Sequence, residues 1–183
     1  MPTANNQLNL NTPVIDFRLP ATDGKMYSPS DFGDAELLII IFMCNHCPYV
    51  QAVIPRFIKL QQEYYDKGVR FLAINSNDDK GYPEDSFEKM KIYFDEWKMN
   101  FPYLRDESQE TARQYDAICT PDIYVYNQKR ILKYRGRLDD NWKDESMVTS
   151  RDLKNAIDDL LAGKDSIENQ VTSIGCSIKW INK

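Results

Sequence analysis

The chain has 183 residues, of which 42% are hydrophobic and 28% charged, and its formal net charge is -5 at pH 7. This length suits a single domain over residues 1–183, and the composition is ordinary for a soluble globular protein. The acidic net charge provides no basic surface for nucleic acid, which excludes a nucleic-acid partner. No apolar run approaches the ~18 residues of a membrane span, which excludes a membrane partner.

The first part of the chain is expected to be a polar lead-in followed by a small hairpin. Residues 1–11 lack the apolar core and cleavage site of a signal peptide, which predicts a cytoplasmic location. The alternating run 14–19 predicts a strand, and the Asp-Gly turn chemistry of 21–25 predicts a return toward residue 27. A short helical turn is expected at 30–32.

The rest of the chain alternates strands and helices. Strands or short extended pieces are predicted at 37–43, 69–75, 101–104, 123–126 and 131–135, and helices at 48–67, 86–100, 107–115 and 151–162. This order predicts an α/β fold in which a crossover helix joins the first strand pair and the last pair is antiparallel. The core should cover about 13–162, and the tail 163–183 has no strong periodicity.

The junction between strand 37–43 and helix 48–67 carries the motif Cys44-Asn45-His46-Cys47. A cysteine at a helix N-terminus meets unpaired backbone N–H groups and the positive end of the helix dipole, both of which favour a thiolate. A reactive thiolate beside a second thiol can open and close a disulfide. The motif therefore predicts redox chemistry.

Two other interpretations of the cysteine pair are weaker. A zinc site would need two more ligands, but Cys119 and Cys176 are isolated and His46 stands between the two cysteines of the motif. We therefore expect no metal and no cofactor. Inert core thiols would have no reason to share a strand-to-helix turn.

Position along the motif predicts separate roles. Cys44 should stand at the helix cap, be the most exposed, and attack as the thiolate; Cys47 should lie nearly one turn into the helix as the shielded resolving thiol. Asn45 and His46 should tune the potential. A protonated His46 would stabilise a neighbouring thiolate, and the alternative is an exposed, solvated ring.

The strand–Cys-x-x-Cys–helix unit, with Thr120-Pro121 directly before a later strand, resembles the thioredoxin superfamily. Over residues 13–162 the layout is most similar to its branch of peroxiredoxin-like (AhpC/TSA) and TlpA/ResA-like proteins. Segments 13–20, 23–25, 101–106 and 134–139 carry the rest of this likeness. The resemblance implies a thioredoxin-like fold: a central mixed sheet flanked by helices, with an N-terminal hairpin extension and a C-terminal tail.

The resemblance also implies that Pro121 is a cis proline packed against the two sulfurs. A cis X–Pro bond would expose the Thr120 backbone as an edge to which an extended substrate could pair. One departure is Leu38, which stands where thioredoxins usually place an acidic residue. The proton acceptor for Cys47 is then unidentified, with Asp122 a weak candidate.

A peroxidase interpretation follows from the same branch of the family. Its signature would make Cys47 the peroxide-reactive thiol, with Cys44 in place of a threonine and Ile40 in place of a proline. An arginine that polarises peroxide could come from Arg137 or Arg135, although an Arg-Gly-Arg turn is more typical of a solvated loop.

Two further cysteines are possible accessories. Cys119, two residues before Pro121, is either a third redox thiol or a small buried hydrophobic residue. Cys176 lies in an oddly apolar part of the tail and either packs on the domain or serves as a resolving thiol or dimer contact.

The sequence thus predicts a thiol–disulfide oxidoreductase that uses a Cys44–Cys47 dithiol. The alternatives are a peroxiredoxin-like antioxidant peroxidase and a non-catalytic redox-sensing or binding module. The expected partners are a protein or small-molecule disulfide or peroxide substrate and a thiol reductant system.

Overall fold

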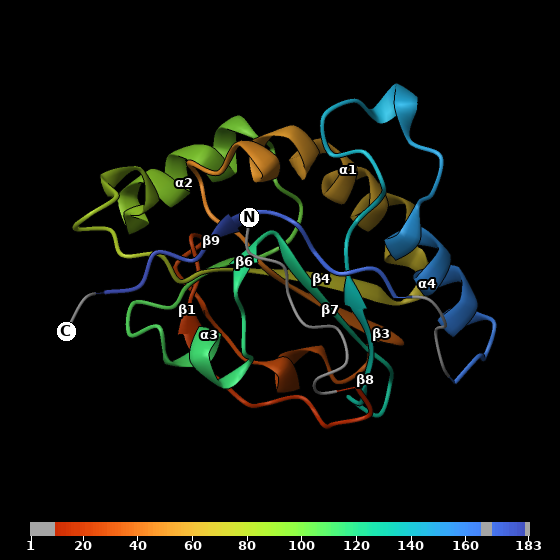
Figure 1. Cartoon of the computed structure of the whole chain (residues 1–183). Coiled ribbons are helices and arrows are strands. Elements are labelled where there is room, and N and C mark those ends of the chain that lie inside the picture. The colour runs from red at the N-terminus through yellow and green to blue at the C-terminus, as the bar shows by residue number, and fades with distance from the viewer. Residues whose placement is uncertain (1–9, 166–169, 182–183) are drawn as a thin grey trace.

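Figure 1 shows the protein as a computed structural model, which describes residues 10–165 and 170–181. Most of the lead-in predicted for residues 1–13 falls outside this range, as do tail residues 166–169 and 182–183. Within the described part of the chain, no helix is both long and apolar enough to cross a membrane.

A five-stranded mixed sheet forms the centre of the molecule, in the order β5-β4-β3-β7-β8. Its strands are β5 (Tyr103–Arg105), β4 (Val69–Asn75), β3 (Leu37–Phe42), β7 (Asp122–Tyr126) and β8 (Leu132–Gly136). β3 is parallel to β4 and antiparallel to β7, which is antiparallel to β8. The predicted crossover and the predicted antiparallel last pair are both confirmed.

Helices cover both faces of this sheet. They are α1 (Pro48–Tyr64), α2 (Phe87–Glu96), α3 (Glu110–Gln114) and α4 (Asp152–Leu161). In Figure 1, α1, α2 and α4 lie on one side and α3 on the other. The thioredoxin-like α/β fold is therefore confirmed.

The central strand β3 is buried along its whole length, and its side chains alternate between two cores. Ile39 and Ile41 belong to the core shared with α1 and α4, whereas Ile40 and Phe42 belong to the core under the N-terminal segment and α3. Because both faces of this strand are buried, its residues form the continuous apolar run seen in the sequence.

The predicted N-terminal strand is mostly wrong. Only β1 (Leu19–Pro20) is a strand, and it pairs with β2 (Met26–Tyr27) in the predicted hairpin. Residues before β1 bond elsewhere: Val14 N–H donates to the Arg130 carbonyl at 2.8 Å. Residues 11–14 therefore lie along the start of β8, and most of the predicted strand 14–19 forms no ladder.

Two short strands lie outside both the central sheet and the hairpin. β6 (Cys119–Thr120) precedes β7, and β9 (Cys176–Ser177) belongs to the tail. They pair antiparallel, and Figure 1 shows the tail crossing the molecule near β6 and the start of α1. The tail thus reaches the region of the cysteine motif.

Candidate active site

Cys47, and not Cys44, caps helix α1. The helix begins at Pro48, which suits proline because the first helical N–H has no partner within the helix. Cys44 lies three residues before the cap, and both side chains are fully buried, with 0% exposure. The predicted placement, an exposed Cys44 at the cap with Cys47 inside the helix, is therefore wrong.

The two sulfurs contact each other and share a neighbour. Cys44 and Cys47 form a side-chain hydrogen bond with one another. The Cys44 sulfur lies 3.4 Å from Thr120 Oγ1, and the Cys47 sulfur lies 3.1 Å from the Thr120 carbonyl oxygen, to which it donates a hydrogen bond only while it is protonated. The Thr120–Pro121 peptide bond is cis, as the resemblance implied.

The pair holds its negative charge on Cys47. The hydrogen bond from Cys44 lowers the pKa of Cys47 to about 5 against the opposing effect of burial, and Thr120 and the Val50 N–H add to the lowering. The pKa of Cys44 is raised, first by its hydrogen bond with Cys47 and then by burial. These directions are the reverse of the roles predicted from position, since the cap residue is the one that meets the helix dipole.

A buried carboxylate that no local sequence pattern indicates anchors the motif. Asp85 accepts hydrogen bonds from Asn45 N–H at 2.7 Å, His46 N–H at 3.3 Å and Asn77 Nδ2 at 2.7 Å. Its other contact is with the His46 ring, where Nδ1 and Oδ2 are 2.6 Å apart. Burial would raise the pKa of Asp85, but the bonds from His46 and Asn77 outweigh it and lower the pKa.

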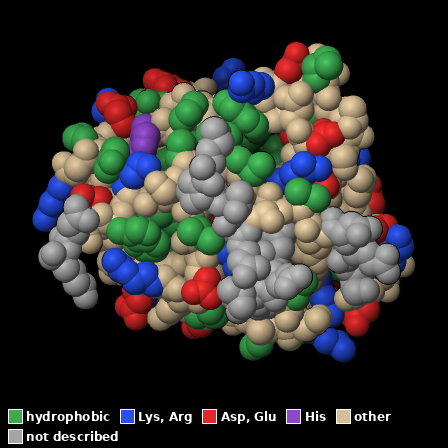
Figure 2. Space-filling view, in the orientation of Figure 1, with side chains coloured by type: hydrophobic (Ala, Val, Ile, Leu, Met, Phe, Trp, Pro, Cys, Tyr) green, Lys and Arg blue, Asp and Glu red, His purple; other side chains and the backbone are tan. Residues whose placement is uncertain are grey.

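His46 forms an ion pair with Asp85 and is not a solvated ring. Its side chain is 26% exposed, and its ring stacks on Tyr82 with centroids 5.2 Å apart. The hydrogen bond with Asp85 raises the pKa of His46. Figure 2 shows the chain's single histidine reaching the surface. Its direct partner is thus the carboxylate and not a thiol.

Asn45 is an internal anchor. Its side chain is fully buried, donates to the Glu84 carbonyl at 2.7 Å and accepts from Tyr103 OH at 2.8 Å. These bonds tie the motif to the loop before α2 and to β5. A substrate-binding role for this side chain is not supported, because its polar atoms are already satisfied.

The tail occupies the edge at which a substrate was expected to pair. In the β6–β9 ladder, Thr120 is opposite Cys176. Gly175 packs so closely that a Cβ there would come within 2.0 Å of the Thr120 carbonyl oxygen. The expectation that the Thr120 backbone is free to pair with a substrate is therefore wrong. The same strand brings Cys176 to the site, where its side chain forms a hydrogen bond with that of Cys47.

Asp122 forms an ion pair with an arginine and is not the proton acceptor for Cys47. It is fully buried, and Arg135 donates to its Oδ2 at 3.1 Å. Burial raises its pKa although Arg135 opposes the rise. Arg135 is 1% exposed, so its expected place in a solvated loop is wrong, and Arg137 forms an ion pair with Asp152 at 3.0 Å.

Cys119 is a buried thiol in strand β6, directly before Thr120. Its sulfur donates to the Pro121 carbonyl at 3.7 Å, and burial raises its pKa. These contacts fit the interpretation as a small buried hydrophobic residue, since a neutral, shielded thiol is a poor nucleophile.

Three potential metal ligands do meet at the motif. Atoms of Cys44, His46 and Asp85 lie within 4.8 Å of one another. The spacing in the sequence makes His46 badly placed for a zinc site with Cys44 and Cys47, but in the fold Asp85 lies against its ring. Thiolate, imidazole and carboxylate are zinc ligands. A metal would, however, have to replace the hydrogen bonds that Asp85 accepts from the motif and from Asn77.

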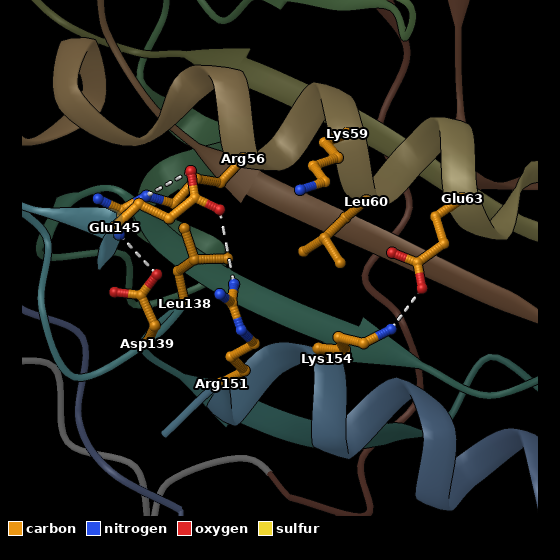
Figure 3. Close-up of a pocket in the computed structure, with 9 residues that line it drawn as sticks. All are labelled: Arg56, Lys59, Leu60, Glu63, Leu138, Asp139, Glu145, Arg151 and Lys154. Atoms are coloured by element: carbon orange, nitrogen blue, oxygen red, sulfur yellow. Dashed lines mark hydrogen bonds and ion pairs between the residues drawn. The ribbon is translucent and has the colours of Figure 1, made fainter. Parts of the chain in front are cut away.

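Two cavities lie near α1, and one of them is lined by the cis proline Pro121. Figure 3 shows the first cavity, between α1 and α4, where Arg56 pairs with Asp139 and Lys154 with Glu63. Its volume is about 150 Å³. No cysteine lines this cavity or the second one. The second cavity, of about 60 Å³, is lined by Pro121 and by residues including Tyr49, Trp142, Arg137, Ser173 and Ile174.

Comparisons with known proteins agree with this geometry. The profile of the AhpC/TSA family matches residues 10–135, whereas no curated protein sequence matches the chain. An uncharacterized conserved protein from Geobacillus kaustophilus has a TM-score of 0.92 at 42% identity, covering 100% of this chain and 98% of that one. A hypothetical protein from Sinorhizobium meliloti has a TM-score of 0.92 at 37% identity, covering 99% and 98%.

A more distant structure shares the fold alone. The thioredoxin domain of a thiol-disulfide oxidoreductase from Bacteroides vulgatus has a TM-score of 0.61 at 15% identity, covering 70% of this chain and 88% of that one. The resemblance to thioredoxin-like proteins is therefore confirmed.

Proposed function

The chain belongs to the AhpC/TSA family, and on this premise we propose that it is a thiol–disulfide oxidoreductase with Cys44 and Cys47 as its redox pair. The observation that carries the proposal is the contact between the two sulfurs at the start of α1, with both also against Thr120. Two thiols in contact can form a disulfide with little movement of the backbone. The family and its structural neighbours are generally redox proteins.

Cys47 is the attacking thiolate in this proposal. It attacks one sulfur of a substrate disulfide, forming a mixed disulfide and releasing the other substrate sulfur as a thiolate. Cys44 then loses its proton to that departing thiolate and attacks the Cys47 sulfur. The Cys44–Cys47 bond forms as the Cys47–substrate bond breaks, and the substrate leaves reduced. A thiol reductant returns the pair to its starting state.

The small cavity beside Pro121 supports a binding place for the substrate group next to its disulfide. Tyr49 and Trp142 pack against each other there, with ring centroids 4.1 Å apart and the ring planes tilted by 36°, and Ile174 of the tail lines the same space. Its volume of about 60 Å³ suits a small apolar group. The proposed substrate is therefore a small disulfide or one carried on a short apolar side chain.

Cysteine substitutions test this assignment. With a small disulfide substrate, the double variant Cys44→Ser/Cys176→Ser should accumulate a mixed disulfide on Cys47, detected by mass spectrometry, because neither neighbouring thiol is left to release it. Cys47→Ser should lose turnover. A mixed disulfide on Cys44 in Cys47→Ser would exchange the two roles, and turnover that survives in both variants would refute the pair. Cys119→Ala is the matched control and should turn over as the wild type does.

A peroxidase is the second candidate, favoured by one observation. The pKa of Cys47 is lowered to about 5, so a thiolate is present at neutral pH to attack peroxide. The two arginines considered for polarising peroxide are paired with Asp122 and Asp152. Stopped-flow measurement of peroxide consumption separates the candidates: a peroxidase should consume peroxide rapidly through Cys47, and an exchanger should not.

A further inference from the structure

The tail brings a third thiol to the redox pair. Thr120 and Cys176 are directly opposite in the β6–β9 ladder, and opposite residues of an antiparallel pair project to the same face. The Thr120 side chain faces the Cys44 sulfur on that face, so the register directs Cys176 toward the pair as well. Cys176 packs against the same core and contacts Cys47.

The position of the tail is fixed on both sides of Cys176. Before it, Gly175 lies against the Thr120 backbone, where no Cβ would fit, and Ser173 donates to the Gly136 carbonyl at 2.7 Å. After it, Lys179 N–H donates to Asn77 Oδ1 at 2.9 Å. The contact between Cys176 and Cys47 is therefore part of the folded arrangement.

Accessibility separates Cys176 from its partners. Cys44 and Cys47 have 0% exposure, whereas Cys176 is only partly buried. Of the three thiols, Cys176 is therefore the one that a reductant in solution reaches most readily while the tail is in place, whereas Cys44 and Cys47 are reached only when neighbouring segments move aside. Among the described cysteines, Cys119 is also fully buried.

We propose that Cys176 is a third redox thiol, which takes over the disulfide from Cys44–Cys47 by bonding to Cys47 and so carries it to the surface. The proposal rests on the proposed function, since it requires the Cys44–Cys47 disulfide to form first. Cys176 is then the thiol through which a small thiol reductant returns the enzyme to its reduced state.

The exchange balances without any added oxidant. The Cys176 thiol loses its proton, and its sulfur attacks the Cys47 sulfur. The Cys47–Cys176 bond forms while the Cys44–Cys47 bond breaks, and Cys44 leaves as a thiolate that takes up the proton. A thiol reductant then attacks the Cys176 sulfur, and a second reductant thiol resolves the resulting mixed disulfide.

Local charge supports this order of events. In the reduced protein, burial and the hydrogen bond with Cys47 raise the pKa of Cys176 to about 11, so it stays a thiol. Formation of the Cys44–Cys47 disulfide removes the charge from Cys47 and frees the Cys176 proton from that bond. Cys176 thus becomes easier to ionise only when there is a disulfide to receive.

Disulfide mapping tests the proposal directly. Trypsin releases Cys44 and Cys47 in one peptide, 26–56, and Cys176 in another, 165–179. After oxidation of the intact protein with hydroxyethyl disulfide and acid quenching, we expect a cross-linked pair of these peptides in the wild type. Cys44→Ser should give the cross-link almost completely, since Cys47 then has one partner. No cross-link in Cys44→Ser would overturn the proposal.

Reduction kinetics provide the second measurement. The oxidised Cys176→Ser protein should be reduced by glutathione at least about tenfold more slowly than the oxidised wild type, because the remaining disulfide is buried. Equal or faster reduction would overturn the proposal. Cys119→Ala is the control and should match the wild type, with thermal unfolding used to check that each variant is folded.

The outcomes distinguish this proposal from the one on which it rests. If Cys176→Ser forms no Cys44–Cys47 disulfide and the wild type forms none, the proposed function fails. If both form it and are reduced at equal rates, the proposed function stands and only the role of Cys176 is refuted.

Discussion

Two buried carboxylates flank the redox pair, and they are stabilised in different ways. Asp85, from the loop before α2, receives hydrogen bonds from Asn45, His46 and Asn77, and its pKa is lowered. Asp122, directly after the cis proline, is paired with Arg135, and its pKa is raised by burial. Among the described residues, Asp122 Oδ1 and Arg135 Nε have no hydrogen-bond partner.

The difference shows what keeps a buried carboxylate ionised. Several aligned N–H donors offset the loss of water around Asp85, whereas one guanidinium and the Tyr124 hydroxyl only partly offset it around Asp122. The partners also differ in whether they can give up their charge. His46 can lose its proton when its carboxylate is removed, but an arginine remains charged. The cost of losing each acid should therefore be unequal.

The largest expected effect comes from removing the acid whose partner stays charged. Asp122→Asn should lower the free energy of unfolding by about 3–5 kcal/mol, because Arg135 is 1% exposed and would be left as an unpaired buried cation. Urea denaturation of variant and wild type measures this. Asp159→Asn, which breaks an exposed pair with Lys164, is the control and should change stability little. A loss no larger than the control's would contradict the comparison.

Removal of the other acid should cost less. Asp85→Asn should lower the free energy of unfolding by about 1–3 kcal/mol, because some N–H donors of the motif lose their acceptor while His46 becomes neutral. The same urea titration checks the order of the two variants. If Asp85→Asn proved the more damaging one, the ability of the partner to neutralise would not be what decides the cost.

The contrast between these acids also shows which parts of the fold and the site can be predicted from the sequence. The strands and the crossover were predictable because their signals are local: the apolar run before Cys44, the change to helical periodicity and the turn residues. Thr120-Pro121 was predictable as a motif. The cap position carried a usable signal as well, since Pro48 at the first helical position points to Cys47 as the N-cap.

The missed parts of the site depend on contacts across the fold. Asp85 meets Asn45 across 40 residues, and a single acid in a turn-rich loop has no periodic signal. β9 is two residues long, and its pairing with Thr120 depends on the path of the tail around the sheet. Neither the buried anchor nor the covered edge could therefore be predicted from local pattern.

The Asp85–His46 pair makes a pH-dependent contribution to stability. Its bond raises the pKa of His46 above the ordinary 6.5, so protonation favours the folded state. The contribution should be complete below pH 6.5 and lost as pH rises through the folded-state pKa. The difference in unfolding free energy between wild type and His46→Gln should therefore shrink at higher pH, by about 1.4 kcal/mol per unit of pKa shift.

That measurement is specific to the histidine because other titrating groups cancel in the difference. Both proteins carry the same thiols and tyrosines. A difference that stayed constant, or grew as pH rose above 6.5, would mean that the ring is not held as an imidazolium by Asp85.

The smallest expected effect distinguishes the two acids at the thiols themselves. The Asp85 charge helps to raise the pKa of Cys44, after the hydrogen bond to Cys47 and burial, whereas Asp122 acts on Cys119. In a thiolate titration followed by ultraviolet absorbance, Asp85→Asn should shift the higher transition of the Cys44–Cys47 pair downward. The lower transition, near the pKa of about 5 of Cys47, should change little, because its main cause is the bond from Cys44.

The matched variant for this titration is Asp122→Asn in a Cys119→Ala background, which removes the one thiol that Asp122 is expected to affect. It should leave both transitions of the pair where the Cys119→Ala protein has them. If Asp122→Asn moved them as far as Asp85→Asn does, the two carboxylates would act on the site alike. The higher transition should also be lost in Cys44→Ser, and this loss would assign the transition to Cys44. The shift of that transition in Asp85→Asn then measures how much the Asp85 charge raises the pKa of Cys44.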